Sequence, residues 1–490
     1  MKRLLYLFVI LSFIAAGCSQ KKGNNYIRAS YKTDIHIVSG NDIHGAIENM
    51  PMLAAAVDSL RAIDKSLLVL SAGDNRTGNP LNDLYTIPAF PMVALMNYIG
   101  FDASTFGNHE FDSEQPLLSK LINLSNFPYI CANVFPDTEL GIQNIPYKFF
   151  DVKGVKVCIL GVIQLGIQGI PDSNPDHLKG IRFEGVEETI NKYLYLRDQC
   201  DVFILLSHIG YEDDCAMAEK FPQFDLIVGG HTHTQIEGGE LHNGVLITQN
   251  VNKLQRVTHT ILTVENGKVT GKRAENIEIS SSKNKNPFVA QIVEKFSDNP
   301  ELKRVLAVAT APFSTYEELG LLMCDALKEM THSEIGFTNM GGVRYDTHPK
   351  GDFTVDDVLR LDPFGNGVVI MELTPKEIED MLIACFYADR NRFPYTSGIK
   401  CDVEYTANAK NEPEKVVKLT LTTDDGKPLD PNKKYKVAGN AYAVTVSDSP
   451  REDEGREFGS ISSDLLIKFL TEKKQINYSG RRCLTEHIVK

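Results

Sequence analysis

Five short runs in the first half of the sequence end in the same way, and this pattern constrains the fold more than any other feature. Each run closes with glycine or serine and is followed by Asp, Asn or His: IHIVSGNDIHG, LLVLSAGDN, DASTFGNHEFD, FILLSHIG and LIVGGHTH. The runs have the composition of buried strands, and helix-like stretches such as MPMLAAAVDSLRAID separate them. Residues 34–280 are therefore predicted to form a layered α/β domain.

The polar residues after these runs are of the types that bind metal ions. They are Asp42, His44, Asp74, Asn108, His109, Asp112, His208, His231 and His233. Because loops converge at the carboxyl ends of strands in α/β folds, we expect these side chains to meet. Residues i and i+2 of an extended segment point the same way, which predicts that Asp42 pairs with His44 and His231 with His233.

Seven of these nine residues, one of them an aspartate shared between two sites, would be enough to hold two divalent ions. Such a centre can activate a water molecule and hold a phosphoryl oxygen. Mixed His, Asp and Asn ligation favours Zn²⁺ or Mn²⁺ over Ca²⁺.

The tripeptide Asp-Ile-His occurs twice, at 34–36 and at 42–44. The first copy lies at the beginning of its run, and eight residues of strand would place it roughly 25 Å from the second. Only Asp42 and His44 are therefore predicted to reach the other ligands. His36 is interpreted as an ordinary strand histidine.

A polar break, SSSKNKNP at 280–287, ends the first region. The next residues, PFVAQIVEKFSDN, place apolar side chains along one helical stripe after a proline, which predicts a connecting helix within a linker at 281–310. Residues 311–490 mix strand-like and helix-like runs and are predicted to form a second, smaller α/β domain.

The motifs NDIHG, GDN, GNHEFD, SHIG and GGHTH resemble those of calcineurin-like metallophosphoesterases, in the variants of the 5′-nucleotidase branch. The resemblance implies a β-sandwich flanked by helices, in four αββα layers. It also implies two ligand sets: Asp42, His44, Asp74 and His233 for one ion, and Asp74, Asn108, His208 and His231 for the other. His109 would stabilise charge on the phosphoryl group, and Asp112 would orient His109.

Later segments resemble the C-terminal nucleotide-binding domain of 5′-nucleotidases: TNMGGVR, LDPFGNGVVIMELT, YTSGIKCDVEY and YKVAGNAYAV. The implied substrate contacts are Asn339 and Arg344 for base and phosphate, Phe364 and Tyr442 for the two faces of the base, and Asp448 for the ribose. Two features depart from the family. AYAVTVSDSPRED replaces its Gly-Gly-Asp-Gly loop, and an arginine expected near His332 is absent.

The function implied is removal of phosphate from nucleoside 5′-monophosphates. The alternatives are a 2′,3′-cyclic-nucleotide 2′-phosphodiesterase/3′-nucleotidase, a nucleotide-sugar hydrolase, and, in another class, a non-catalytic nucleotide- or metal-binding lipoprotein. The formal net charge of −13 opposes a nucleic-acid polymer as partner.

The N-terminus is predicted to be a targeting segment. Residues 1–18 combine Lys2 and Arg3, an apolar run and the ending AAGC, which resembles a bacterial lipoprotein processing site. Cys18 would then carry the lipid, residues 19–33 would be a tether, and the protein would lie at the cell envelope. A plain secretory signal is the alternative. The spacing of the other eight cysteines leaves their pairing open.

Overall fold

The computed structural model describes residues 32–166, 168–408 and 411–489. The predicted signal peptide, Cys18 and the tether up to residue 31 lie outside the described residues. Strand β1 begins at Lys32, two residues before the predicted start of the first domain. In the described part of the chain, no helix is long and apolar enough to cross a membrane.

Two sheets form the centre of the first domain. The seven-stranded sheet has the order β15 (Lys268–Glu278), β14 (Arg256–Glu265), β1 (Lys32–Gly40), β2 (Leu68–Ser71), β3 (Ala103–Ser104), β4 (Tyr129–Ile130) and β6 (Asn144–Ile145). The six-stranded sheet has the order β12 (Glu240–His242), β13 (Val245–Thr248), β11 (Leu226–Val228), β10 (Val202–His208), β8 (Val155–Ile163) and β7 (Tyr147–Val152). The predicted run DASTFG contributes only the two-residue strand β3.

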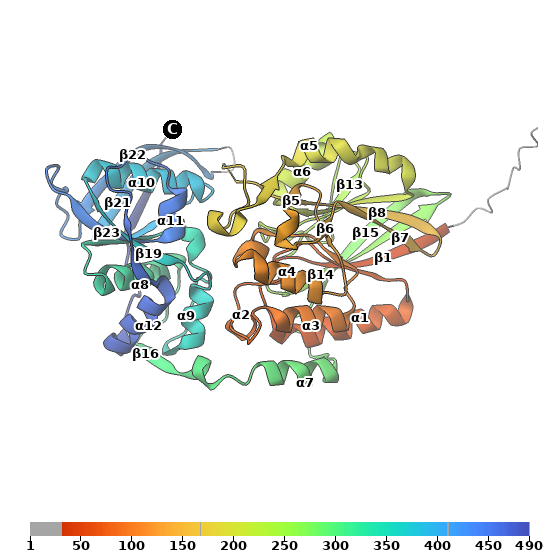
Figure 1. The fold of residues 1–490 in the computed structure, drawn as a ribbon, viewed down its shortest axis with the longest axis horizontal. Helices are drawn as coiled ribbons and strands as arrows, with labels where there is room; N and C mark the ends of the chain where they lie inside the picture. The colour runs from red at the N-terminus through yellow and green to blue at the C-terminus, as the bar shows by residue number, and fades with distance from the viewer. Residues whose placement is uncertain (1–31, 167, 409–410, 490) are drawn as a thin grey trace, which may run out of the picture.

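The two sheets pack face to face, and helices cover both outer faces (Figure 1). Ile37 and Leu70 of the first sheet share one buried core with Ile159 and Leu206 of the second. The outer helices are α1 (Met50–Ile63), α3 (Phe90–Ile99) and α4 (Gln115–Leu124) on the first sheet, and α5 (Val186–Tyr193) and α6 (Tyr211–Lys220) on the second. Burial on both faces explains why the runs are continuously apolar. The predicted layered α/β class is confirmed.

Helix α7 (Pro287–Phe296) follows the polar break. The Asn286 side chain accepts hydrogen bonds from the first backbone amides of α7 and donates one of 2.8 Å to Asp58. Val289 and Val293 are buried in the same core as α1. This helix is therefore packed into the first domain, and the chain crosses to the second domain after Phe296 (Figure 1).

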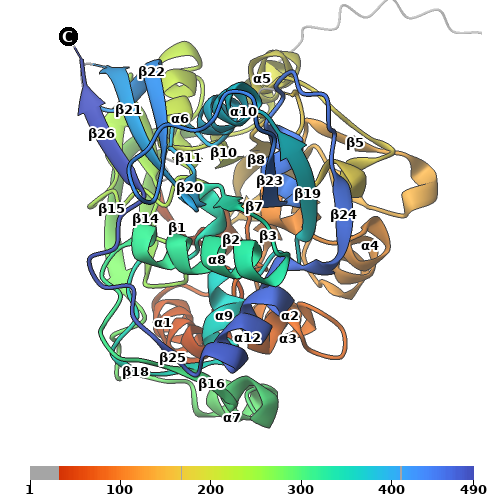
Figure 2. The same cartoon turned by 90° about the vertical axis from the view of Figure 1, so that its left-hand side faces the viewer.

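The second domain is built around a five-stranded sheet, which Figure 2 shows from the outer side. Its order is β20 (Tyr395–Ser397), β17 (Ile335–Thr338), β23 (Tyr435–Asn440), β19 (Gly367–Leu373) and β24 (Arg456–Ile461). Its helices are α8 (Tyr316–Met330), α9 (Val355–Leu361), α10 (Pro375–Ala388), α11 (Ala441–Val446) and α12 (Ser462–Lys473). Val437 packs with α10, and its neighbour Ala438 packs with α8 and α12, so helices cover both faces.

Two three-stranded sheets complete the second domain. One contains β18 (Gly351–Thr354), β16 (Val305–Ala309) and β25 (Gln475–Ile476), and the other contains β22 (Pro413–Thr423), β21 (Ile399–Ala407) and β26 (Leu484–Ile488). The short helix α2 (Pro80–Asp83) of the first domain lies beside α9, so the two domains meet there.

Candidate active site

The predicted ligands lie at one edge of the two sheets. Strands β1 and β2 run parallel, and so do β10 and β11, so their carboxyl ends point the same way. The side chains at these ends are Asp42 and His44 after β1, Asp74 after β2, Asn108 after β3, His208 at the end of β10, and His231 and His233 after β11. The fold therefore brings residues from five parts of the chain to one place.

The ligand atoms form two neighbouring groups. Atoms that lie within 4.8 Å of one another belong to Asp42, His44 and His233 in the first group, and to Asp74, His208 and His231 in the second. Asp42 Oδ1 lies 3.2 Å from His233 Nε2, and Asp74 Oδ2 lies 3.1 Å from His208 Nε2. Ligand atoms of Asp74, His44 and His109 also lie within 4.8 Å of one another, so the Asp74 carboxylate is near both groups, as a bridging ligand must be.

The donor atoms suit divalent cations. The Nδ1 atoms of His44 and His208 donate to the carbonyl oxygens of Thr77 and Ala72, at 2.8 Å and 2.6 Å, which leaves each Nε2 lone pair facing the site. Nε2 of His208 and Oδ1 of Asn108 are buried without a well-formed hydrogen bond. Because buried polar atoms without partners are costly, these atoms fit a site that binds cations.

The backbone at the ligands corrects one prediction. Positive φ angles occur at Asp42 (50°), His44 (49°), Asp74 (53°), His231 (81°) and His233 (56°). These residues lie in tight left-handed turns. The prediction that an extended segment pairs Asp42 with His44 and His231 with His233 is therefore wrong about the backbone. The turns bend the chain back over the strand ends. A non-glycine residue in this conformation costs roughly 1–2 kcal/mol, and such strain is concentrated at functional sites.

His109 is held differently from the other histidines. Its Nδ1 donates to Asp112 Oδ2 at 2.7 Å, and its Nε2 lies 3.9 Å from Asp74 Oδ2. Burial, the largest single influence, lowers the pKa of His109, but the carboxylates of Asp112 and Asp74 outweigh it and raise the pKa above its usual value. The imidazole can therefore carry a proton on the nitrogen that faces the site.

His36 lies in β1, apart from both ligand groups. Its Nδ1 is 3.0 Å from Nε2 of His259, and its Nε2 is 4.0 Å from Asp64. The first Asp-Ile-His copy is thus a strand segment, as the sequence predicted.

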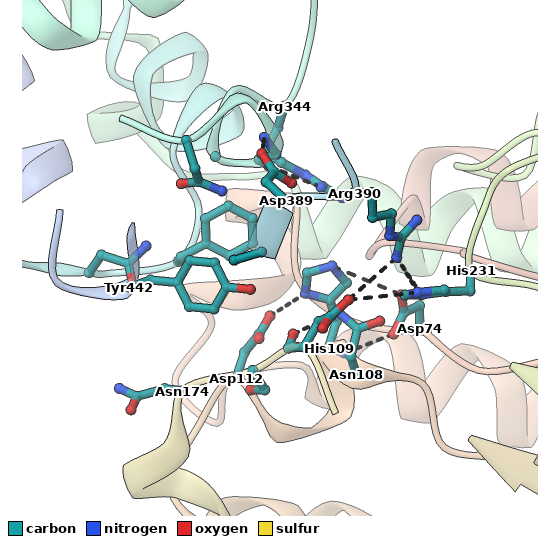
Figure 3. A pocket seen from close by; sticks show the side chains of 18 of the residues that line it. Asp74, Asn108, His109, Asp112, Asn174, His231, Arg344, Asp389, Arg390 and Tyr442 are labelled. Carbon is teal, nitrogen blue, oxygen red and sulfur yellow. Dashed lines mark hydrogen bonds and ion pairs between the residues drawn. The ribbon is translucent and has the colours of Figure 1, made fainter. Parts of the chain in front are cut away.

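A cavity of about 290 Å³ lies between the two domains beside the ligand groups. Its lining includes Asp74, Asn108, His109 and Asp112 of the first domain and Asn339, Arg344, Phe364 and Tyr442 of the second. The Phe364 ring stacks on the His109 ring with centroids 5.6 Å apart, and the Arg344 guanidinium lies 5.4 Å from the Phe364 centroid. Figure 3 shows Tyr442 across the cavity from His231. Residues about 200 positions apart therefore face one another.

Asp448 is placed differently from the other predicted substrate residues. It lies two residues beyond the end of α11 and is not among the described residues that line the cavity. A ribose contact by Asp448 stays a prediction.

Several residues in or beside the site were not predicted from sequence. Glu110 is buried and accepts hydrogen bonds from the backbone amides of Asp74, Asn75 and Gly107, at 2.9, 2.9 and 2.6 Å. It ties the Asp74 turn to the Asn108 turn. Its position inside the GNHEFD motif was the available signal. Asp172, Asn174, Asp389, Arg390 and Arg392 also line the cavity, and no local pattern marks them.

Comparisons with known families match both domains. The family described as calcineurin-like phosphoesterase matches residues 33–235, and the 5′-nucleotidase, C-terminal domain, matches residues 299–449. Helix α7 lies between the two matched ranges.

Individual relatives cover nearly the whole chain. The 5′-nucleotidase of Vibrio cholerae is 28% identical over 82% of this chain and 84% of its own length. The trifunctional nucleotide phosphoesterase protein YfkN of Bacillus subtilis is 26% identical over 91% of this chain, which spans only 35% of that protein. The crystal structure of a 5′-nucleotidase precursor from Thermus thermophilus has the same fold, with a TM-score of 0.81, 23% identity, and coverage of 94% of this chain and 100% of that one. The chain therefore consists of a calcineurin-like phosphoesterase domain followed by a 5′-nucleotidase C-terminal domain, and it is similar over most of its length to proteins named 5′-nucleotidase.

Proposed function

We propose that this protein is a two-metal hydrolase that releases phosphate from nucleoside 5′-monophosphates, with Zn²⁺ or Mn²⁺ as its ions. One observation carries the proposal. The Asp74 carboxylate lies between two ligand groups, and the cavity that opens beside it is closed by an arginine and two aromatic rings of the second domain. These are the elements needed to bind a phosphate attached to a flat base.

The ligand atoms divide into two sets. Asp42, His44, Asp74 and His233 would hold one ion, and Asp74, Asn108, His208 and His231 the other. When bound, the ions supply positive charge to the phosphoryl oxygens and lower the pKa of a water molecule. Backbone hydrogen bonds from Asp42 N to Gly73 O, at 3.0 Å, and from His44 N to Asp74 O, at 2.9 Å, hold the two turns together and position these ligands.

His109 belongs to neither set in this assignment. Asp112 fixes the orientation of the ring through Nδ1, so that Nε2 points toward the cavity. From there it would donate a hydrogen bond to a phosphoryl oxygen as negative charge develops on it.

Recognition of the nucleotide would come from the second domain. The Arg344 guanidinium reaches the first ligand group, with Nη2 at 3.4 Å from His44 Nε2, where a phosphoryl group would lie. Phe364 and Tyr442 would stack on the base, and the Asn339 side chain would contact the base edge.

A location at the cell envelope is part of the proposal. The charged start, apolar run and AAGC ending of residues 1–18 support a lipid anchor on Cys18, which would leave the two domains outside the inner membrane. Free nucleotides outside the cytoplasm are suitable substrates for such an enzyme.

Phosphate release over a panel of substrates tests the function. The purified chain would be assayed with 5′-, 3′- and 2′,3′-cyclic nucleotides and UDP-glucose, with Mn²⁺ or Zn²⁺ supplied. We expect the 5′-monophosphates to react fastest, and a chelator to abolish the reaction. Faster turnover of a cyclic nucleotide or of UDP-glucose would favour those alternatives. Two bound ions without any turnover would identify a binding protein.

A further inference from the structure

A second arginine reaches the ligand groups from the C-terminal domain. Arg390 lies just after α10, and its Nη2 contacts the imidazole of His231 in the second ligand group (Figure 3). Arg344 contacts His44 in the first group. Each ligand group is therefore faced by one guanidinium from the second domain.

The local structure aims Arg390 into the cavity. Arg390 and Asn391 both have left-handed backbones, with φ of 53° and 57°, a conformation that arginine rarely adopts. This sharp turn after the helix directs the side chain toward the first domain. The neighbouring Arg392 is bound instead by Asp389, through its carbonyl and its carboxylate.

The partners of Arg390 show that it is placed to bind an anion. Its Nη2 lies 3.5 Å from Oδ2 of Asp172, and that oxygen lies 3.9 Å from His231 Nε2. Asp172 comes from the first domain and lines the same cavity. The Asp172 carboxylate thus lies beside the contact between the Arg390 guanidinium and His231, where the positive charge of the guanidinium attracts an anion.

We propose that Arg390 binds the phosphoryl group opposite Arg344, and that the pair selects dianionic phosphomonoesters over monoanionic phosphodiesters. This inference rests on the proposed function and deepens it by naming the charge class of substrate. A bound phosphoryl group would replace Asp172 as the partner of Arg390.

The selectivity follows from charge. A phosphomonoester carries about two negative charges at neutral pH, whereas a phosphodiester carries about one. Each guanidinium can form two parallel hydrogen bonds to phosphoryl oxygens, and a diester has fewer free oxygens to accept them. Two arginines on opposite sides therefore favour the monoester more than one arginine does.

The test compares Arg390→Ala and Arg390→Lys with the wild type, as the full chain loaded with metal. Inorganic phosphate and adenosine binding would be measured by calorimetry, and kcat/KM would be measured on a 5′-monophosphate and on bis(p-nitrophenyl) phosphate. Arg390→Ala should weaken phosphate binding roughly 10- to 100-fold, the range for hydrogen bonds to a charged group, with adenosine binding unchanged. Its preference for the monoester over the diester should fall. Arg390→Lys keeps the positive charge but cannot form the two parallel hydrogen bonds of a guanidinium. Its phosphate affinity should therefore lie between those of the wild type and Arg390→Ala.

Lys376→Ala is the matched control. It removes one positive charge from α10, the helix that precedes Arg390, at an exposed position where Lys376 pairs with Asp380. Unchanged phosphate affinity in Arg390→Ala would overturn the proposal, and so would equal losses on the monoester and the diester, or loss of a bound ion. By contrast, a wild type that releases phosphate from no nucleotide would reject the proposed function. The phosphate affinities measured by calorimetry would still test the role of Arg390, because they do not depend on turnover.

Discussion

The histidines of the site differ in the partners of their second ring nitrogens. In His208, Nδ1 donates to the carbonyl of Ala72, so Nε2 is directed at Asp74. In His109, Nδ1 donates to the Asp112 carboxylate, which favours the protonated ring. A carbonyl partner suits a metal ligand, and a carboxylate partner suits a proton or hydrogen-bond donor.

His109→Ala is the prediction at this scale. We expect kcat on a 5′-monophosphate to fall roughly 100- to 10,000-fold, the usual contribution of such a donor. Both ions should stay bound, because the two proposed ligand sets are left intact. Metal content and phosphate release measured on the same sample check this. Since His109 is also close to His44 and Asp74, loss of one ion would instead make it a ligand. Undiminished turnover would refute its role altogether.

At the scale of elements, the ends of β2 and β3 depend on two glycines. A Cβ on Gly107 would lie 2.1 Å from Asp74 Oδ1 and 2.6 Å from Asp74 N, and a Cβ on Gly73 would lie 2.6 Å from Gly107 N. The turns that carry Asp74 and Asn108 therefore touch through their backbones. The Glu110 carboxylate also joins the two turns, because it accepts hydrogen bonds from the backbone amides of both Asp74 and Gly107.

Gly107→Ala is expected to displace Asp74 and to lower metal binding at both sites, because the proposed ligand sets share Asp74. Equilibrium dialysis against Mn²⁺ or Zn²⁺ measures this loss. Gly185→Ala is the control, since a Cβ there meets no atom within 4 Å and the backbone is ordinary. If Gly107→Ala bound two ions with wild-type affinity, Asp74 would not be the shared ligand.

The end of α9 carries a buried carboxyl group just before Phe364. Burial raises the pKa of Asp362 to about 6, against the hydrogen bond that Ser462 donates to it. Because this folded pKa lies above the unfolded one, the cost of the buried charge is present above about pH 6 and disappears as the pH falls toward 4. Asp362→Asn should therefore gain up to about 3 kcal/mol of stability relative to the wild type between pH 4 and pH 8. Thermal unfolding at both pH values checks this, and an identical difference at both would contradict it.

At the scale of the whole molecule, the site exists only where the two domains face each other. Arg360 of α9 reaches across to Glu48 and Asn79 of the first domain, at 3.2 Å and 3.1 Å. This contact joins the two domains and helps to hold the second domain against the first. The metal ligands alone would serve any phosphate ester, so selectivity for nucleotides depends on this arrangement.

Phe364→Ala tests the contribution of the second domain. Stacking on a base contributes roughly 1–3 kcal/mol, so KM for a 5′-monophosphate should rise roughly 5- to 150-fold. KM for glycerol phosphate, which has no base, should change little, and Phe364→Tyr should behave like the wild type. Equal losses on both substrates would show that Phe364 acts on the catalytic group through its contact with His109 instead.

The sequence alone determined which residues are candidate ligands, in which order the two domains follow, and that the first is a layered α/β domain. These properties are local, because an apolar run, the glycine that ends it and the polar residue that follows lie within a few positions of one another in the sequence. In this way the sequence distinguished Asp42, which follows its apolar run, from Asp34, which lies at the beginning of the same run.

Only the tertiary structure decided how these residues meet. The left-handed turns at Asp42 and Asp74, the buried Glu110 and the position of Asp448 outside the cavity depend on atoms that are distant in sequence. The same holds for Arg390 and Asp172, which come from different domains and have no motif around them. Their roles follow from distances of a few ångströms, and such distances are set by the packing of two sheets and two domains, which no local pattern encodes.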